Sequence, residues 1–312
     1  MNGIELSENF FFEYGMPLLK ADFPELLPRV AAGIVGSGSE CLGFDDEISR
    51  DHDYEAGFCL WLSREDEAVY GFRLIRAYNA LPKEYRGVRK QAASAYGSSK
   101  FGVFVAEDFF ERLTGLSAAP APEDTDAWLY TPEQALAAAT GGKVFYDGSG
   151  GVTALRAALA SPPEDVRLKK IAARLALMAQ SGQYNFARCL AHGERAAARL
   201  ALAEFVNHAL YALHALARRY TPYYKWRFRS ARGLGEPYRG VTLKLERLLT
   251  DETTDEEKRA AVEEIARDFV EILRGQDLAE AHGDYLEPYA FGVAGRIRSQ
   301  SLRARHIMDC GE

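Results

Sequence analysis

The amino-acid sequence predicts an α+β fold, with a mixed sheet flanked by helices in residues 1–150 and an all-α helical bundle in residues 151–312. In the first part, short apolar or β-branched runs alternate with segments of helical spacing, which is typical of mixed sheets. After Val152 nearly every segment has helical period and is rich in alanine, leucine, glutamate and arginine. The change of pattern predicts a domain boundary between residues 148 and 165.

Four runs in the first part are expected to form strands, because each is short, apolar and bounded by turn residues. They span residues 30–35, 54–62, 101–105 and 143–146. Helices are expected over residues 66–80 and 107–113. Another begins at Thr131-Pro132-Glu133, where threonine can cap the helix and proline suits its first position.

The second part contains two helices with clear signatures. One is expected over residues 195–220, because five apolar residues in it form a single stripe that would face a core. They are Leu202, Val206, Ala209, Leu213 and Leu216. The other is expected to begin at Thr254, a favourable N-cap before an acidic first turn.

Composition excludes several classes of protein. The chain has 312 residues, of which 47% are hydrophobic and 27% charged, as in an ordinary globular protein. Its net charge of −7 argues against coating nucleic acid through bulk electrostatics. Four cysteines without paired spacing favour neither a zinc site nor a disulfide framework. We find no signal-peptide pattern and no apolar run long enough to span a membrane, so a cytoplasmic protein without a membrane partner is expected.

Two motifs point to chemistry. The glycine-serine turn Gly36-Ser37-Gly38-Ser39 follows the first strand, and an aspartate pair, Asp51 and Asp53, precedes the second. In a strand the two carboxylates would point to the same side, about 6.6 Å apart. Paired carboxylates suit Mg²⁺, which completes its shell with waters and substrate phosphates. Glycine N–H groups and serine hydroxyls suit a phosphate.

Each motif alone has a plainer interpretation. A glycine-serine stretch is often a flexible turn, and an aspartate pair is often a solvated strand end. His52, between the aspartates, is interpreted as an ordinary neighbour that points to the other face. In strand–turn–strand order, the two motifs together predict a site for Mg²⁺ and a nucleoside triphosphate.

The spacing resembles that of the DNA polymerase β-like nucleotidyltransferases, which include the aminoglycoside and minimal nucleotidyltransferases. Eleven residues separate Gly38-Ser39 from Asp51, and thirteen separate Gly36-Ser37 from it. Both distances fit that family, so either serine could contact the triphosphate, with Ser39 preferred. Residues 33–62, 144–147 and 220–226 also resemble the bacterial DUF4037 group of that superfamily.

The resemblance implies a nucleotidyltransferase-type sheet and a helical domain that closes over the acceptor. Asp51 and Asp53 would hold Mg²⁺, with two ions expected, and ATP would be the preferred triphosphate. The acceptor would attack in line and pyrophosphate would leave. The family usually adds a third carboxylate on a later strand, but residues 101–105 carry none. Glu107 and Asp147 are the candidates, although the first also suits a helix start and the second a turn.

A basic and aromatic stretch lies in the helical part. Between Arg218 and Arg239 there are seven basic residues and one acid, with Tyr220, Tyr223, Tyr224 and Trp226 interleaved among them. Lys225 could contact the triphosphate while a ring stacks on the base or the acceptor. The alternative is an aromatic corner with solvated arginines. RNA binding is a further interpretation, which the acidic remainder of the chain makes the weaker one.

The sequence therefore predicts a magnesium-dependent nucleotidyltransferase that moves a nucleoside monophosphate, AMP by preference, to a small molecule, a protein or an RNA. The alternative is a weakly active or inactive nucleotidyltransferase-like interaction protein, such as the neutralising partner of a toxin. Hydrolase chemistry is disfavoured, because no serine–histidine–acid pairing stands out and six scattered histidines are poor material for a metal cage.

Overall fold

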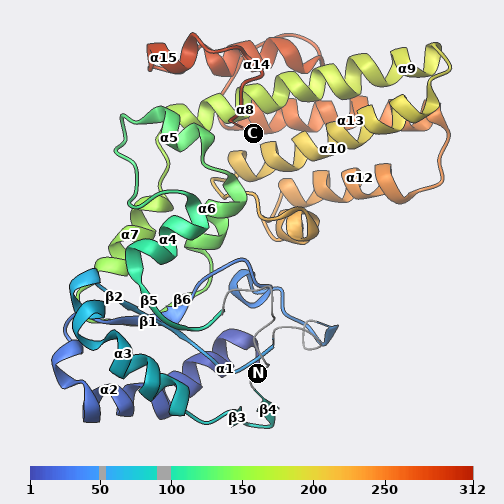
Figure 1. Ribbon diagram of the computed structural model, residues 1–312. Helices are drawn as coiled ribbons and strands as arrows, with labels where there is room; N and C mark the ends of the chain where they lie inside the picture. The colour runs from blue at the N-terminus through green and yellow to red at the C-terminus, as the bar shows by residue number, and fades with distance from the viewer. Residues whose placement is uncertain (49–53, 90–99, 312) are drawn as a thin grey trace. The chain divides into compact units, whose positions relative to one another are not determined.

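The computed structural model describes residues 1–48, 54–89 and 100–311 (Figure 1). These residues divide into two compact units. The first comprises Met1–Ala121 and Gln134–Ser161, and the second comprises Pro122–Glu133 and Pro162–Glu312. The described strands all belong to the first unit, and the elements described in the second are all helices, so the fold is α+β. Residues 122–133, which the sequence pattern assigned to the first domain, belong to the second unit.

A four-stranded mixed sheet forms the centre of the first unit, in the order β5-β2-β1-β6. The central strand β1 (Ala31–Ile34) is antiparallel to both β2 (Cys59–Leu62) and β6 (Lys143–Asp147). The edge strand β5 (Gly102–Val105) is parallel to β2. The end of β1 therefore lies beside the beginnings of the other three strands.

Helices cover both faces of this sheet, because all four residues of β1 and all four of β2 are buried. Figure 1 shows α1, α2 and α3 on one side and α4, α6 and α7 on the other. The bounds are α1 Gly3–Phe10, η1 Phe11–Gly15, α2 Met16–Asp22, η2 Pro24–Leu26, η3 Glu40–Leu42, α3 Arg64–Ala80, α4 Ala106–Thr114, α6 Glu133–Thr140 and α7 Gly151–Leu159, with a small hairpin of β3 Glu84–Tyr85 and β4 Val88–Arg89.

The second unit is a helical bundle. Its longest run of helix is α8 Glu164–Met178, which continues through the π-helical η5 Ala179–Phe186 into α9 Ala187–Ala191. The other elements are α5 Thr125–Tyr130, α10 Arg195–Leu216, η6 Tyr224–Trp226, α11 Arg227–Arg232, α12 Tyr238–Thr250, α13 Asp255–Gly275, α14 Leu286–Ala294 and α15 Gln300–Arg303. None of the described helices is long and apolar enough to cross a membrane.

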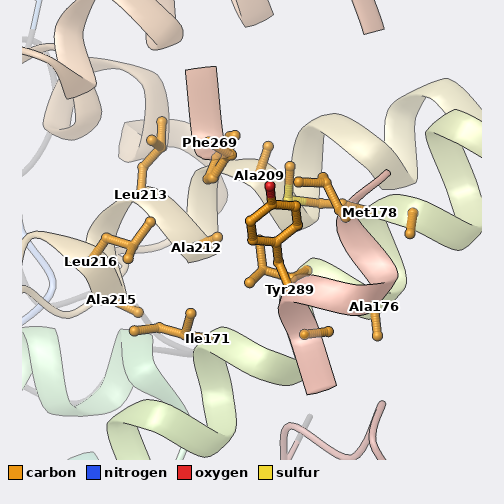
Figure 2. Close-up of a cluster of buried hydrophobic side chains, with 14 of the residues drawn as sticks. Ile171, Ala176, Met178, Ala209, Ala212, Leu213, Ala215, Leu216, Phe269 and Tyr289 are labelled. Atoms are coloured by element: carbon orange, nitrogen blue, oxygen red, sulfur yellow. The ribbon is translucent and has the colours of Figure 1, made fainter. Parts of the chain in front are cut away.

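Figure 2 shows the core of this bundle, where side chains from α8, α10, α13 and α14 meet. Phe269 of α13 and Tyr289 of α14 are completely buried there. The Tyr289 hydroxyl donates to the carbonyl of Ala281 at 2.9 Å or of Gly283 at 3.0 Å, so the ring is buried while its polar end keeps a partner. Each large apolar side chain buried in this way contributes about 1.5–3 kcal/mol.

Most of the expected elements are confirmed. The strands expected over residues 30–35, 101–105 and 143–146 correspond to β1, β5 and β6. The second strand is shorter than expected, because residues 54–58 are described outside any strand and β2 begins at Cys59. The N-cap expected at Thr254 is present, as part of a capping box with Glu257. The sequence analysis did not predict α1, although Asn2 and Glu5 form a capping box at its start.

Candidate functional site

The glycine-serine turn continues directly from the end of β1. Gly36 has a φ of +152°, a conformation that residues with a side chain rarely adopt. After Ser39 the chain folds back, because the N–H of Cys41 donates to the Gly38 carbonyl at 3.1 Å and that of Phe44 to the Ser39 carbonyl at 2.8 Å. These bonds fix the turn at the end of the sheet where β1 stops.

The donors of this turn have no acceptor among the residues that the structure describes. The backbone N–H groups of residues 36–39 donate no hydrogen bond there, and neither do the hydroxyls of Ser37 and Ser39. Ser37 is exposed and the other three residues are partly exposed, so solvent or a ligand reaches them. A row of unpaired N–H groups in a turn forms a concavity that binds anions. Four backbone N–H groups and two hydroxyls at this end of the sheet are therefore accessible and make no hydrogen bond to a described residue.

A partly buried ion pair lies beside the turn. The carboxylate of Glu40 is almost buried, and its Oε1 is 2.7 Å from the ammonium of Lys100. The same carboxylate lies against Gly38, where an alanine Cβ would come within 2.5 Å of Oε2. An alanine at position 38 would therefore force the Glu40 carboxylate to move, so Gly38 allows the close packing of the turn on Glu40. Lys100 neutralises the negative charge that would otherwise repel an anion from the turn.

Other polar groups gather around a small cavity at the same end of the sheet. The cavity has a volume of about 10 Å³, and its lining includes Ser7, Ser39, Asp45 and Glu55. This is about the space of one water molecule, so the cavity is too small for a substrate. The Ser7 hydroxyl is completely buried and has no hydrogen-bond partner in the described part of the chain, which a water here would provide. Asp45 accepts from the N–H of Gly3, at the start of α1, at 2.6 Å.

The donor atoms around this cavity suit a hard cation better than zinc. Its acidic and hydroxyl-bearing lining residues are oxygen donors and histidine is not among the lining residues, although Lys100 also lines it and is paired with Glu40. Burial raises the pKa of the Cys41 thiol and raises that of Cys59 to about 12, so both stay protonated at neutral pH. Oxygen ligands are those that Mg²⁺ prefers.

The predicted metal ligands, Asp51 and Asp53, lie outside the described residues. Tyr54, the first residue described after them, lines the same cavity as Ser39. Within the described ranges, no group of three or more histidine, cysteine, aspartate or glutamate side chains is arranged to hold a metal ion. The role of the aspartate pair stays a prediction.

The structure does not bring the two candidates for a third carboxylate to this end of the sheet. Ile34, at the end of β1, pairs with Lys143, whereas Asp147 pairs with Ala31, three residues earlier in β1. At about 3.3 Å per residue, Asp147 lies about 10 Å along the sheet from the end of β1, and the turn begins beyond that end. Glu107 follows the last residue of β5, which pairs with the last residue of β2, so it also lies at the opposite end. The expectation that either residue completes the site is therefore corrected.

Both residues have local structural roles instead. The carboxylate of Asp147 accepts from the N–H groups of Gly150 at 2.9 Å and Thr153 at 2.8 Å, which caps the start of α7. Glu107 is in the first turn of α4, where a negative charge is favourable, and is 3.7 Å from Arg64. These are the turn and helix-start interpretations that the sequence also allowed.

Three residues that lie near the turn were not predicted from the sequence as site residues. Lys100 lies two residues before β5, and the parallel pairing with β2 brings it to the end of the sheet where β1 stops. Glu40 follows the glycine-serine motif directly. Glu55 is two residues after Asp53, so the alternation Asp51, Asp53, Glu55 could have marked it as a third acid on one side of an extended chain.

Lys225 belongs to the second unit, in η6. It is exposed, and its ammonium is 5.0 Å from the centre of the Trp226 ring. Its predicted contact with a triphosphate stays a prediction.

Comparison with known proteins supports part of the resemblance. Residues 128–227 match the family described as "Domain of unknown function (DUF4037)". The matched range includes residues 144–147 and 220–226, which the sequence analysis associated with that group, but not the glycine-serine turn. No curated protein matches the chain.

Among solved structures, the chain is similar to a nucleotidyltransferase-like protein from Exiguobacterium sibiricum. The two share 14% sequence identity with a TM-score of 0.39, and the match covers 91% of this chain and 80% of the other. A similarity at this level carries no conclusion about the site. The polymerase β-like relationship therefore stays a prediction from the motifs of the sequence.

Proposed function

We propose that the protein is a magnesium-dependent nucleotidyltransferase, which transfers a nucleoside monophosphate, AMP by preference, from a nucleoside triphosphate to an acceptor. The observation that carries the proposal is the turn after β1, where four backbone N–H groups and two serine hydroxyls have no acceptor among the described residues. A turn of this kind could hold the phosphates, but it has no metal ligands. The aspartate pair that follows in the sequence would supply the ligands for Mg²⁺.

In this proposal the turn holds the triphosphate. The N–H groups of residues 36–39 donate to phosphate oxygens, and the hydroxyl of Ser39 adds a further hydrogen bond. Because these donors are backbone groups fixed by the bonds of Cys41 and Phe44, they need little reorganisation when the ligand binds. The Lys100–Glu40 pair keeps the floor of the turn electrically neutral.

Asp51 and Asp53 would hold Mg²⁺, which when bound neutralises the charge of the phosphates and helps to align them. The acceptor's nucleophilic oxygen or nitrogen attacks the α-phosphorus in line. The bond from that phosphorus to the bridging oxygen breaks, and pyrophosphate leaves with the electron pair. The acceptor loses its proton to a nearby base.

We propose Glu55 for the third carboxylate, in place of Glu107 and Asp147. Glu55 lines the cavity that Ser39 also lines, whereas the other two candidates lie at the far end of the strands. Its role would be to complete the metal shell or to accept the proton of the acceptor.

Labelled nucleoside triphosphates test this proposal directly. The protein is incubated with Mg²⁺ and each α-³²P-labelled triphosphate, alone and with candidate small-molecule, protein and RNA acceptors, and pyrophosphate release and label transfer are measured. We expect Glu55→Gln to lower transfer at least about a hundredfold, as for loss of a general base, with triphosphate binding kept. Glu107→Gln and Asp147→Asn are the matched controls and should leave transfer within about twofold of wild type.

Two results would contradict these proposals. If no triphosphate binds and none is turned over, the enzyme proposal is wrong, and the interaction-protein alternative takes its place. If Glu107→Gln or Asp147→Asn abolishes transfer while Glu55→Gln does not, the assignment of the third carboxylate is wrong.

A further inference from the structure

A short segment of the second unit, residues 219–229, combines exposed aromatic rings with positive charge. It connects α10 to α11 and reads Arg-Tyr-Thr-Pro-Tyr-Tyr-Lys-Trp-Arg-Phe-Arg. The sequence contains no acidic residue between Glu204 and Glu236, although the whole chain has a net charge of −7. The 219–229 segment is therefore a local basic region on an acidic protein.

The segment is anchored to α10 by side-chain contacts. The guanidinium of Arg227 lies 4.2 Å from the centre of the Tyr211 ring and donates to the Tyr211 hydroxyl at 2.6 Å. It also donates to the Asn207 side chain and, at 3.2 Å, to the carbonyl of Pro222. Further along, the hydroxyl of Ser230 is hydrogen-bonded to the buried His214 at 2.9 Å. These bonds hold both ends of the aromatic turn.

The anchored turn presents two aromatic rings to solvent. Tyr223 is 48% exposed and Tyr224 is 66% exposed, and their ring centres are 4.4 Å apart. Large apolar groups left exposed together often mark a binding surface. The two rings contact each other with their planes inclined at 50°, so their exposed outer sides are what a base could stack on.

Positive charges border the rings. Arg218 and Arg232 are paired with carboxylates, of Glu164 at 2.9 Å and Glu246 at 2.8 Å. By contrast, Arg219 and Lys225 are exposed, and neither forms an ion pair with a described residue. Arg219 lies four residues before the two tyrosines and Lys225 directly after them, so both cations are close to the rings in the sequence.

From this arrangement we propose that the 219–229 segment binds single-stranded RNA. Successive bases would stack on Tyr223 and Tyr224, and the phosphates between them would lie near Arg219 and Lys225. A duplex keeps its base faces stacked inside, so it cannot use these rings. If the strand end also serves as the acceptor, that step rests on the proposed transfer reaction, but the binding does not.

Fluorescence anisotropy of a fluorescein-labelled 12-nucleotide uridine RNA tests the binding by itself, in the absence of Mg²⁺ and triphosphate. We expect wild type to bind, and the Tyr223→Ala, Tyr224→Ala double variant to bind at least about tenfold more weakly. The corresponding double Phe variant keeps both rings and should bind as wild type. Arg219→Gln with Lys225→Gln should weaken binding and reduce its dependence on salt.

Two control variants match these changes. Tyr184→Ala removes a ring that is 50% exposed elsewhere in the same unit, and Arg259→Gln removes an exposed charge on α13. Both should bind the RNA as wild type, and melting temperatures will show that every variant is folded.

Three results would overturn the inference. They are equal binding by the double Ala variant, equal binding of a 12-base-pair RNA duplex, and displacement of the RNA by an equal concentration of uridine monophosphate. The last result would mean that the segment binds a single nucleotide. Because no metal or triphosphate is present, these results say nothing against the proposed transfer reaction.

Discussion

Replacing Gly38 by alanine tests the packing of the turn. The new Cβ would lie 2.6 Å from the Glu40 carboxyl carbon, where ordinary contacts begin at 3.4 Å. The carboxylate must therefore move by about 1 Å, and the simplest movement lengthens its 2.7 Å contact with Lys100. At an effective dielectric constant of about 20, a change from about 2.7 to about 3.7 Å weakens the attraction by about 1.5 kcal/mol.

We therefore expect Gly38→Ala to lower the free energy of unfolding by about 1–2 kcal/mol, measured by urea denaturation. In a Glu40→Ala background the same substitution should cost almost nothing, because the obstructing carboxylate is gone. Gly275→Ala is the control, since no atom outside its own helix lies within 4 Å of that position. An equal cost with and without Glu40 would refute the packing explanation, because the cost would then arise from the backbone.

Three further predictions concern other parts of the molecule. Asp147→Ala should lower stability by about 1 kcal/mol, through loss of the α7 cap, without changing Mg²⁺-dependent triphosphate binding; thermal denaturation and a binding titration check both. The hydrogen bond from Arg167 lowers the pKa of Glu164 from 4.5 to about 2, so this carboxylate stabilises the fold above pH 4.5 and loses its contribution as the pH falls towards 2. Urea denaturation at pH 5 and pH 3 should show a smaller loss for Glu164→Gln than for wild type. At pH 8 a thiol reagent should modify Cys189 readily, since the other three cysteines are buried and should react only on unfolding; rapid reaction of all four in the folded protein would contradict this.

The sequence predicted the strands of the sheet well, because short apolar runs between turn residues have few other solutions. Residues 54–62 were the exception. Their apolar alternation begins before the strand does, and β2 extends only over the residues that pair with β1 and β5. Strand length is set by the partners across the sheet, which a single sequence does not display.

The same limit explains why the sequence suggested Glu107 and Asp147 as the third carboxylate, although both lie at the other end of the sheet. Glu107 and Asp147 each follow or end a strand, which is all that the sequence records. Whether a strand end lies beside the turn depends on strand direction, and β6 runs antiparallel to β1. Lys100 shows the converse case, because only the parallel pairing of β5 with β2 reveals that a residue before β5 lies near Glu40.

The sequence indicated that the glycine-serine turn could bind a phosphate, but it did not predict that the N–H groups of the turn would be unpaired. Gly36-Ser37-Gly38-Ser39 has the composition of a phosphate-binding turn and equally that of a flexible linker. The distinction depends on the bonds that Cys41 and Phe44 make back to the turn, and on the absence of described acceptors for the remaining donors. Both are tertiary properties that composition does not determine.

Equilibrium dialysis with ATP, with and without Mg²⁺, tests the central claim most directly. It compares wild type with the Asp51→Ala, Asp53→Ala double variant and with a control in which the exposed acids Asp22 and Glu25 are replaced by alanine. We predict Mg²⁺-dependent binding of ATP by wild type and control, and its loss in the Asp51, Asp53 variant. Equal binding by all three proteins, or binding by none, would contradict the account of this site.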